Sequence, residues 1–310
     1  MKPIATRYRT SLLVALVWAA CAACSSGSGS LDEPVGPDQP QTPPTGEGNA
    51  YWPELPLTVA NEDYLYVTHF CRVGDATHAR NYTLCFDKSR RAAGWVAYPL
   101  HNVHLGSGRP DPDPWDFDPD IAQSLQAALA LGSYSGSYDR GHQIPNADRN
   151  ADIREGSMCY QTFYASNATP QAHDLNAGSW ADLETKVRSW ARNCADTLYV
   201  VTGAWWDPAK TQYATDRSGN RCPIPAAYFK VVARTVAGNI RTAGDRLGDY
   251  PADKLKTIGF WVENSDSRAN DHPRAWVKSV AEIEALTGYR FFPTLPEAVK
   301  QQKNTTLWGL

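Results

Sequence analysis

Two short polar blocks hold the residues of this chain whose chemistry is most distinctive. The first is the run Asp139-Arg140-Gly141-His142, which places a carboxylate, a guanidinium, a flexible glycine and an imidazole side by side. The second block lies further along the chain and includes Asn176 and Glu184. An imidazole can accept a proton near neutral pH, a guanidinium pairs with phosphate oxygens, and an amide oxygen can bind Mg²⁺. These residue types suit the hydrolysis of a phosphate ester.

The two blocks resemble the motif of the DNA/RNA non-specific endonucleases, the DRGH branch of the ββα-metal nucleases. The matching residues are Tyr138-Asp139-Arg140-Gly141-His142-Gln143-Ile144-Pro145, then Ser166-Asn167-Ala168-Thr169-Pro170-Gln171, Leu175-Asn176, Trp180 and Glu184. The segments 95–98 and 283–293 also look like parts of this family, so the resemblance spans roughly 80–297. It implies an α+β fold, the ββα-metal (His-Me finger) nuclease fold, with a central, mostly antiparallel sheet flanked by helices.

The resemblance implies a role for each polar group of the motif. His142 corresponds to the general base, and Asn176 to the protein ligand of Mg²⁺, with Mn²⁺ as the alternative ion. Because Mg²⁺ keeps much of its hydration shell, one amide oxygen can be its only direct protein ligand. Glu184 lies one turn beyond Trp180 on the same helical face, where a carboxylate could orient the water molecules around the ion.

Two arginines are candidates for neutralising the phosphate. Arg140 lies inside the motif. Arg109 departs from the family pattern, because residues 110–114 separate it from Trp115, whereas the family's arginine lies close before a tryptophan. Asn167 matches an asparagine of the motif that supports the site, and it is counted among the candidate catalytic residues.

Other polar and aromatic residues have plainer interpretations. Asp139 is expected to orient its loop or to pair with an arginine rather than to bind metal. His101 and His104 could suggest a metal pair, but surface positions fit them better. The pair Trp205-Trp206 could stack on bases, although packing in the core is favoured.

The predicted activity is Mg²⁺-dependent endonucleolytic cleavage of DNA and RNA, with little sequence preference and with 5′-phosphate products. Two alternatives stay open. One is a catalytically inactive, nuclease-like surface lipoprotein that binds nucleic acid or an envelope partner, and the intact set of His142, Asn176 and Glu184 argues against it. The other is a narrow nuclease used against competitors. No obligate protein partner is evident from the sequence.

The N-terminal sequence predicts an export signal that spans residues 1–23. Basic residues precede an apolar stretch at 12–20 that is too short to cross a bilayer. Small residues and two cysteines follow, as in a bacterial lipoprotein signal, with Cys24 favoured over Cys21 as the lipidated residue. The prediction is an exported, membrane-anchored lipoprotein of the bacterial envelope or a secreted protein; the plainer alternative is an ordinary cleaved signal.

The next segment, 24–50, is predicted to be a disordered tether. Residues 51–310 are predicted to form one endonuclease domain. The tether is rich in Ser, Gly and Pro, so it cannot bury enough apolar surface to offset the cost of ordering. Without the leader and tether, 27 basic and 29 acidic residues remain. A tight sequence-independent binder of nucleic acid is usually basic. An enzyme that must release its product can rely on local clusters of positive charge.

The domain contains five cysteines, Cys71, Cys85, Cys159, Cys194 and Cys222. Because exported domains can keep disulfides, we expect bridges between Cys71 and Cys85 and between Cys194 and Cys222, with Cys159 free. Other connectivities remain open.

Hydrophobic patterning predicts strands and helices in irregular alternation, which favours α+β over a doubly wound sheet. The predicted strands are 81–86, 95–100, 197–203, 228–236 and 257–262. The predicted helices are 121–131, 179–194 with a capping pattern at Ser179 and Asp182, and 273–286, which starts with proline and ends before Gly288.

Overall fold

The computed structural model describes residues 52–238 and 246–310. The predicted signal at 1–23, the tether at 24–50 and the candidate lipidation sites Cys21 and Cys24 lie outside the described residues. Within the described residues, no helix is both long enough and apolar enough to cross a membrane.

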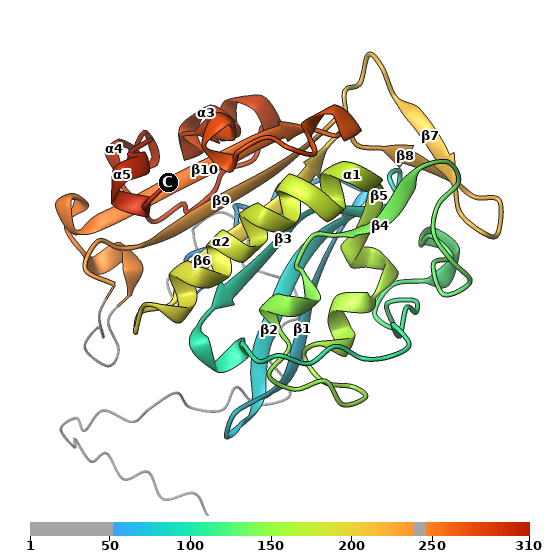
Figure 1. Ribbon diagram of the computed structural model, residues 1–310, viewed down its shortest axis with the longest axis horizontal. Coiled ribbons are helices and arrows are strands. Elements are labelled where there is room, and N and C mark those ends of the chain that lie inside the picture. Colours follow the sequence, from blue (N-terminus) through green and yellow to red (C-terminus); the bar gives the residue numbers. More distant parts are fainter. Residues whose placement is uncertain (1–51, 239–245) are drawn as a thin grey trace, which may run out of the picture.

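A seven-stranded antiparallel sheet forms the centre of the domain (Figure 1). Its strand order is β1-β2-β3-β6-β9-β10-β11, and all six neighbouring pairs are antiparallel. The strands are β1 (Tyr64–Val73), β2 (Ala76–Asp87), β3 (Ala92–Leu100), β6 (Leu198–Trp205), β9 (Ala227–Thr235), β10 (Leu255–Glu263) and β11 (Val277–Lys278). The five predicted strands are therefore present. The edge strand β1 was missed, because its polar residues at Thr68, His69 and Arg72 hide the strand pattern.

Helices cover both faces of the sheet, so the central strands are buried throughout. In β3, Val96 joins one core cluster, which contains Leu183 and Val187 of α2 (Ala181–Arg192). The neighbouring Trp95 joins a second cluster on the opposite face, where α3 (Val280–Thr287) and α4 (Glu297–Lys300) pack. Successive side chains of a strand point to opposite faces, and this alternation divides the core into two layers.

Two small sheets lie beside the central one. The first pairs β4 (Tyr138–His142) with β5 (Ala168–Ala172), and the second pairs β7 (Gln212–Thr215) with β8 (Arg221–Ile224). The chain then runs from β5 through the short α1 (His173–Leu175) into α2. Strands β4 and β5 with helix α2 form a ββα unit, as the resemblance implied.

The predicted helix 121–131 is wrong. Only a single 3₁₀ turn, Gln123–Leu125, forms there. The Gln126 side chain is buried and donates to the backbone carbonyls of Asp118 and Ile121, which holds the segment as a packed loop. Helix propensity is weak enough for such contacts to override it.

The other two predicted helices are confirmed in part. Helix α2 is present, but Ser179 does not cap it, because its hydroxyl donates to the backbone oxygen of Arg268. The segment 273–286 divides into a 3₁₀ turn, strand β11 and helix α3. A capping box between Ser279 and Glu282 starts α3, and Gly288 ends it with a φ of 77°.

The predicted disulfides are also wrong. All five described cysteines are free. Cys71 lies opposite Ala79 in the β1–β2 ladder and Cys85 lies opposite Tyr66, so the two thiols occupy different positions along the sheet. Cys222 packs into a third apolar cluster with Trp115 and Phe163, whereas the Cys194 thiol contacts the backbone of Asp196.

Candidate active site

A cleft of about 360 Å³ opens between the β4–β5 pair and the start of α2. It brings together five of the six predicted site residues: Arg109, Arg140, His142, Asn176 and Glu184. The other charged or polar residues that line it are Asp113, Trp115, Ser133, Asp139 and Asn146.

Pairing between β4 and β5 sets the position of His142. The last residue of β4 is His142, which lies opposite Ala168, and the preceding Gly141 lies opposite Thr169. A Cβ at Gly141 would collide with the side chain of Gln171, so glycine is required for this close approach. The Asp-Arg-Gly-His run is thus a strand that presents its histidine at the edge of the cleft.

His142 sits in an aromatic slot. Its ring centroid lies 4.6 Å from that of Trp115 and 5.1 Å from that of Phe163, which meets it edge-on. Burial, together with the positive charges of Arg109 and Arg140, lowers the pKa of His142 to about 3. The Nε2 atom is buried and has no hydrogen-bond partner among the described residues. The imidazole is therefore neutral at physiological pH and able to take up a proton.

Asn176 lies where the chain kinks between α1 and α2. Gly178, at the kink, has φ −101° and ψ −116°, and a side chain there would approach the backbone oxygen of Ala269. The Nδ2 atom of Asn176 donates to Oδ2 of Asp139 (2.9 Å), and Nδ1 of His173 lies 2.9 Å from the same oxygen. No hydrogen bond from the described residues reaches Oδ1 of Asn176. Asp139 thus fixes the amide with its oxygen available to a cation.

Glu184 approaches the cleft from α2. Its side chain is 14% exposed, and it lies 3.9 Å from the guanidinium of Arg188. Burial raises the pKa of Glu184 to about 7, against the opposing effects of Lys230 and Arg188. A carboxylate with such a pKa is partly ionised at neutral pH and can accept hydrogen bonds from water.

The two arginines lie on the β4 side of the cleft. Arg109 donates from Nε and Nη2 to the two carboxylate oxygens of Asp113, at 2.7 and 2.6 Å. Arg140 lies over the Trp115 ring at 4.7 Å and donates to the backbone oxygen of Leu129. Their guanidiniums supply the positive charge of the site, although Asp113 already balances that of Arg109.

These donors fit a hard divalent cation. An amide oxygen held in place, a nearby carboxylate and room for water are the features of a Mg²⁺ site that keeps part of its hydration shell. Asn176 would hold such an ion directly, and Glu184 would hold its water molecules.

The sequence profile of the DNA/RNA non-specific endonucleases matches residues 66–298 of this chain. The chain belongs to this family. A nuclease of Serratia marcescens is 31% identical over 255 residues, which cover 78% of this chain and 86% of the relative. A nuclease of Nostoc sp. is 31% identical over 215 residues, which cover 68% of this chain and 70% of the relative. The protein is accordingly an endonuclease, a hydrolase of phosphodiester bonds.

A solved structure supports the fold of the endonuclease. A chain of the EndoG/EndoGI complex superposes with a TM-score of 0.54 at 20% identity, covering 72% of this chain and 89% of the other. The mostly antiparallel sheet and the ββα unit agree with the ββα-metal nuclease fold.

Asn167 does not line the cleft of the endonuclease, contrary to its place among the predicted catalytic residues. It is fully buried, and its Oδ1 accepts from the backbone of Ile144. Its Nδ2 donates to the backbone oxygens of Ile144 and Thr162. All of its polar atoms are therefore used to hold the loop that follows His142.

Sequence reasoning missed two carboxylates of the site. Asp139 was expected to orient its loop or to pair with an arginine, but it binds the Asn176 amide and His173 instead. Asp113 was not predicted, although its spacing of four residues from Arg109 permits the observed pair. The other expectations had mixed outcomes: His104 and Trp206 are buried, whereas His101 is half-buried.

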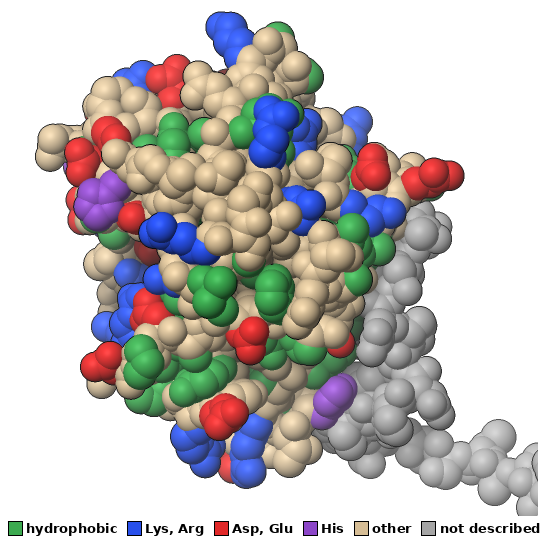
Figure 2. All heavy atoms as spheres, turned by 90° about the vertical axis from the view of Figure 1, so that its right-hand side faces the viewer, with side chains coloured by type: hydrophobic (Ala, Val, Ile, Leu, Met, Phe, Trp, Pro, Cys, Tyr) green, Lys and Arg blue, Asp and Glu red, His purple; other side chains and the backbone are tan. Residues whose placement is uncertain are grey.

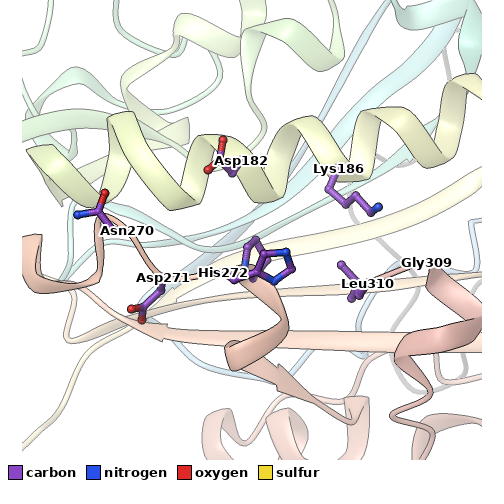
Figure 3. A pocket seen from close by; sticks show the side chains of 8 residues that line it. Asp182, Lys186, Asn270, Asp271, His272, Gly309 and Leu310 are labelled. Carbon is purple, nitrogen blue, oxygen red and sulfur yellow. The ribbon is translucent and has the colours of Figure 1, made fainter.

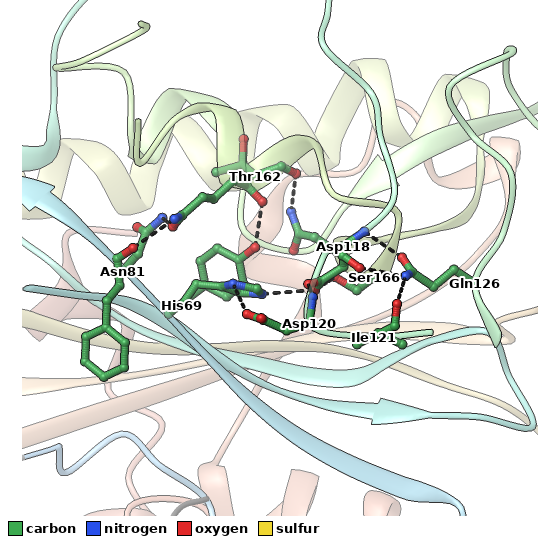
Figure 4. A network of polar contacts seen from close by, with 12 residues as sticks. His69, Asn81, Asp118, Asp120, Ile121, Gln126, Thr162 and Ser166 are labelled. Carbon is green, nitrogen blue, oxygen red and sulfur yellow. Dashed lines mark hydrogen bonds and ion pairs between the residues drawn. The ribbon is translucent and has the colours of Figure 1, made fainter. Parts of the chain in front are cut away.

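A second polar cluster lies away from the cleft, around His69 (Figure 4). Its Nε2 lies 3.0 Å from Oδ2 of Asp118, and its Nδ1 lies 3.5 Å from Oδ2 of Asp120. Asp118 also accepts from the Ser166 hydroxyl at 2.5 Å and is itself buried. The arrangement could suggest a metal site. However, its groups are already bonded to one another, and they tie β1 to the loops at 118–126 and 166.

A second hollow, of about 370 Å³, borders the opposite side of α2 (Figure 3). Asp182 and Lys186 line it from the helix, facing residues 270–273. No buried side-chain atom of the described residues that line it lacks a partner.

Surface charge agrees with the near-neutral composition. On the face that carries β7 and β8, positive and negative side chains are interspersed rather than gathered into one patch (Figure 2). The cleft itself contributes two arginines, Arg109 and Arg140.

Proposed function

We propose that this endonuclease is Mg²⁺-dependent, cuts both DNA and RNA, and leaves 5′-phosphate ends. The observation that carries the proposal is the Asn176 amide, which Asp139 orients within the same cleft as the neutral imidazole of His142. Mn²⁺ would be accepted as an alternative ion, because it also binds oxygen donors.

Each residue then has a distinct task. His142 accepts the proton of the attacking water. Arg140 and Arg109 pair with the non-bridging oxygens of the phosphate. Glu184 accepts hydrogen bonds from water near Asn176 and holds it in place. When bound, the metal supplies Lewis acidity, which stabilises the charge on the phosphate and on the leaving oxygen.

The low pKa of His142 is compatible with its role as base. Part of the lowering comes from the positive charges of Arg109 and Arg140. A phosphodiester bound between these guanidiniums neutralises their charge, so the pKa of His142 rises when substrate binds. The proton affinity of His142 would then be higher at the step in which it takes the proton of the attacking water.

Low sequence preference follows from the same set of groups. Arginine, histidine and a metal-bound amide all address the phosphate and not the edges of the bases. None of these groups is assigned to the 2′ position of the sugar, which suits a substrate range that includes both DNA and RNA.

We further propose that the protein is exported and anchored by a lipid on Cys24, with Cys21 as the alternative. The support is the sequence pattern: a basic start, an apolar stretch and cysteines preceding a Ser/Gly/Pro-rich segment. Residues 24–50 would hold the domain 51–310 away from the membrane. DNA and RNA would then be met outside the cell.

The test uses the full chain, as wild type and as His142→Ala. Each is incubated with supercoiled plasmid and with RNA, in Mg²⁺ and in chelator, and the product ends are tested by ligation. We expect metal-dependent cleavage of both substrates to ligatable 5′-phosphate ends, and none by the variant. No cleavage by folded wild type would contradict the proposal and favour a nucleic-acid-binding lipoprotein.

A further inference from the structure

Lys230 is a buried lysine for which the site described above gives no role. It lies in the middle of β9 and is 1% exposed. Its Nζ atom has no hydrogen-bond partner among the described residues. Because a buried ammonium without a partner destabilises a fold, such a residue calls for an explanation other than packing.

The side chain of Lys230 reaches the residue at which α2 begins. Its Nζ lies 5.2 Å from the ring centroid of Trp180, which follows the kink that positions Asn176. Burial lowers the pKa of the Lys230 ammonium, whereas the carboxylates of Glu184 and Asp148 raise it, and Arg188 lowers it further. The carboxylate of Glu184, which α2 places in the cleft, is therefore approached from the sheet by Lys230.

Arg188 cannot serve fully as the countercharge of Glu184, because it is engaged by Asp148. Nη1 of Arg188 lies 3.1 Å from Oδ1 of Asp148 but 3.9 Å from Oε2 of Glu184. Asp148 also accepts a hydrogen bond from the hydroxyl of Tyr98 at 2.9 Å. Because Asp148 pairs with Arg188, Lys230 is the other cation that can balance the charge of Glu184. No direct ion pair joins the two side chains, so their attraction acts at longer range.

We propose that Lys230 is a positioning residue for cleavage, whose buried ammonium lies behind Glu184 and directs its carboxylate into the cleft. This inference rests on the proposed function, since Glu184 acts there through water near the metal. The pKa of Glu184 agrees with it: after burial, which raises that pKa, the largest effect is the lowering by Lys230. Arg188 lowers it further, whereas Asp148 raises it. The charged or titratable groups that line the rest of the cleft are Arg109, Asp113, Asp139, Arg140 and the neutral His142.

The test is Lys230→Met in the full chain, with Lys256→Met as the matched control. Lys256 is also a buried lysine of the sheet and lies over a tryptophan, with its Nζ 4.6 Å from the Trp308 ring, but it is not among the residues that line the cleft. For each protein we would measure kcat against pH, the Mg²⁺ concentration for half-maximal activity, and the melting temperature.

We expect Lys230→Met to lower kcat at pH 7 by about 10- to 100-fold. Without the ammonium, the pKa of Glu184 rises, so the acidic limb of the pH–rate profile should move to higher pH by roughly one unit or more. The melting temperature should not fall, because replacing a buried unpaired charge with an apolar side chain is often neutral or stabilising. Lys256→Met should leave the pH profile unchanged.

A double variant separates positioning from general damage. In a Glu184→Gln background, Lys230→Met should cause no further loss of kcat. If wild type is active and Lys230→Met keeps its rate and pH profile, the inference is wrong and the proposed function stands. If wild type is inactive on DNA and RNA, the proposed function fails first. Should Lys230→Met not fold, Lys230→Gln replaces it, with the same expected shift of the acidic limb.

Discussion

The cleft around His142 and the cluster around His69 are built from the same kinds of side chain. Each places a histidine beside aspartates and aromatic rings, and each includes a carboxamide. Either could be taken for a metal or catalytic site from composition alone. They differ in how their polar atoms are used.

In the His69 cluster, the polar atoms are bonded to one another. Both ring nitrogens of His69 face a carboxylate, and Asp118 also accepts from Ser166 and from the backbone of Asp120. Gln126 in turn bonds the backbone of Asp118. Such a network holds loops together, and its two buried members, His69 and Asp118, are bonded within it.

In and near the cleft, several polar atoms lack a partner among the described residues. Nε2 of His142 and Nζ of Lys230 are buried and unbonded among the described residues, and Asp139 occupies only the nitrogen of the Asn176 amide. Buried polar groups normally find partners. The imidazole nitrogen of His142 and the amide oxygen of Asn176 therefore have no protein partner that would compete with a ligand. Buried atoms without a partner also occur away from the cleft, as at Glu54 and Thr294. It is therefore the combination of an open cleft with unpaired polar atoms, and not residue type, that distinguishes the active site from the His69 cluster.

The sharpest test of this comparison substitutes the two histidines in parallel. His142→Ala should lower kcat by about 10²–10⁴-fold, the usual contribution of a general base. His69→Ala should keep turnover per folded molecule within a few fold. It should instead lower the melting temperature, because Asp118 would be left buried without its partner. Plasmid cleavage and thermal unfolding of both variants give the answer, and near-normal turnover by His142→Ala would refute the assigned base.

The two asparagines offer the next comparison. Asn176→Ala removes the amide oxygen proposed to bind metal, so a much higher Mg²⁺ concentration should be needed for activity while the melting temperature changes little. Asn167→Ala removes three buried hydrogen bonds and should destabilise the fold by about 1–3 kcal/mol without changing the Mg²⁺ requirement. Metal titrations of cleavage, together with denaturant unfolding, separate the two effects. The reverse pattern would mean that Asn167 is the ligand.

Asp139→Ala should have an intermediate effect. It removes the acceptor that orients the Asn176 amide, so the Mg²⁺ affinity should fall by about 10- to 100-fold, as for other partners of metal ligands. At saturating Mg²⁺ most of kcat should return, since Asp139 does not itself bind the ion in this account. A kcat that stays low at all Mg²⁺ concentrations would show that Asp139 has a more direct role.

The smallest expected effect concerns stability at acidic pH. The pKa of His142 in the folded protein, about 3, lies below its ordinary value of 6.5. The folded state therefore binds fewer protons than the unfolded state between these values, so stability is retained above pH 6.5 and is lost as the pH falls toward 3. Wild type should lose stability more steeply over this range than His142→Ala. Equal slopes in denaturant unfolding would contradict the neutral state assigned to this imidazole.

Much of the site could be predicted from the sequence, because its residues lie in two contiguous blocks. Strand β4 carries Arg140 and His142, and the entry to α2 carries Asn176 and Glu184, so one pairing of β4 with β5 brings the blocks together. The central strands were also predictable, since continuous runs of β-branched and aromatic residues mark strands buried on both faces.

The features that were missed depend on contacts between distant parts of the chain. Asn167 belongs to the motif, yet only the folded loop shows that its amide is fully used by Ile144 and Thr162. The segment 121–131 has a helical composition, but Gln126 fixes it as a loop through side-chain bonds. Cysteine spacing likewise says nothing of strand register, which separates Cys71 from Cys85.

The most direct test of the central claim is the binding of Mn²⁺, followed by electron paramagnetic resonance without substrate. Wild type, Asn176→Ala and Asp118→Asn would be titrated under the same conditions. We predict that wild type and Asp118→Asn bind the ion alike and that Asn176→Ala does not. Loss of binding in Asp118→Asn, with binding kept in Asn176→Ala, would place the metal in the His69 cluster and contradict the account.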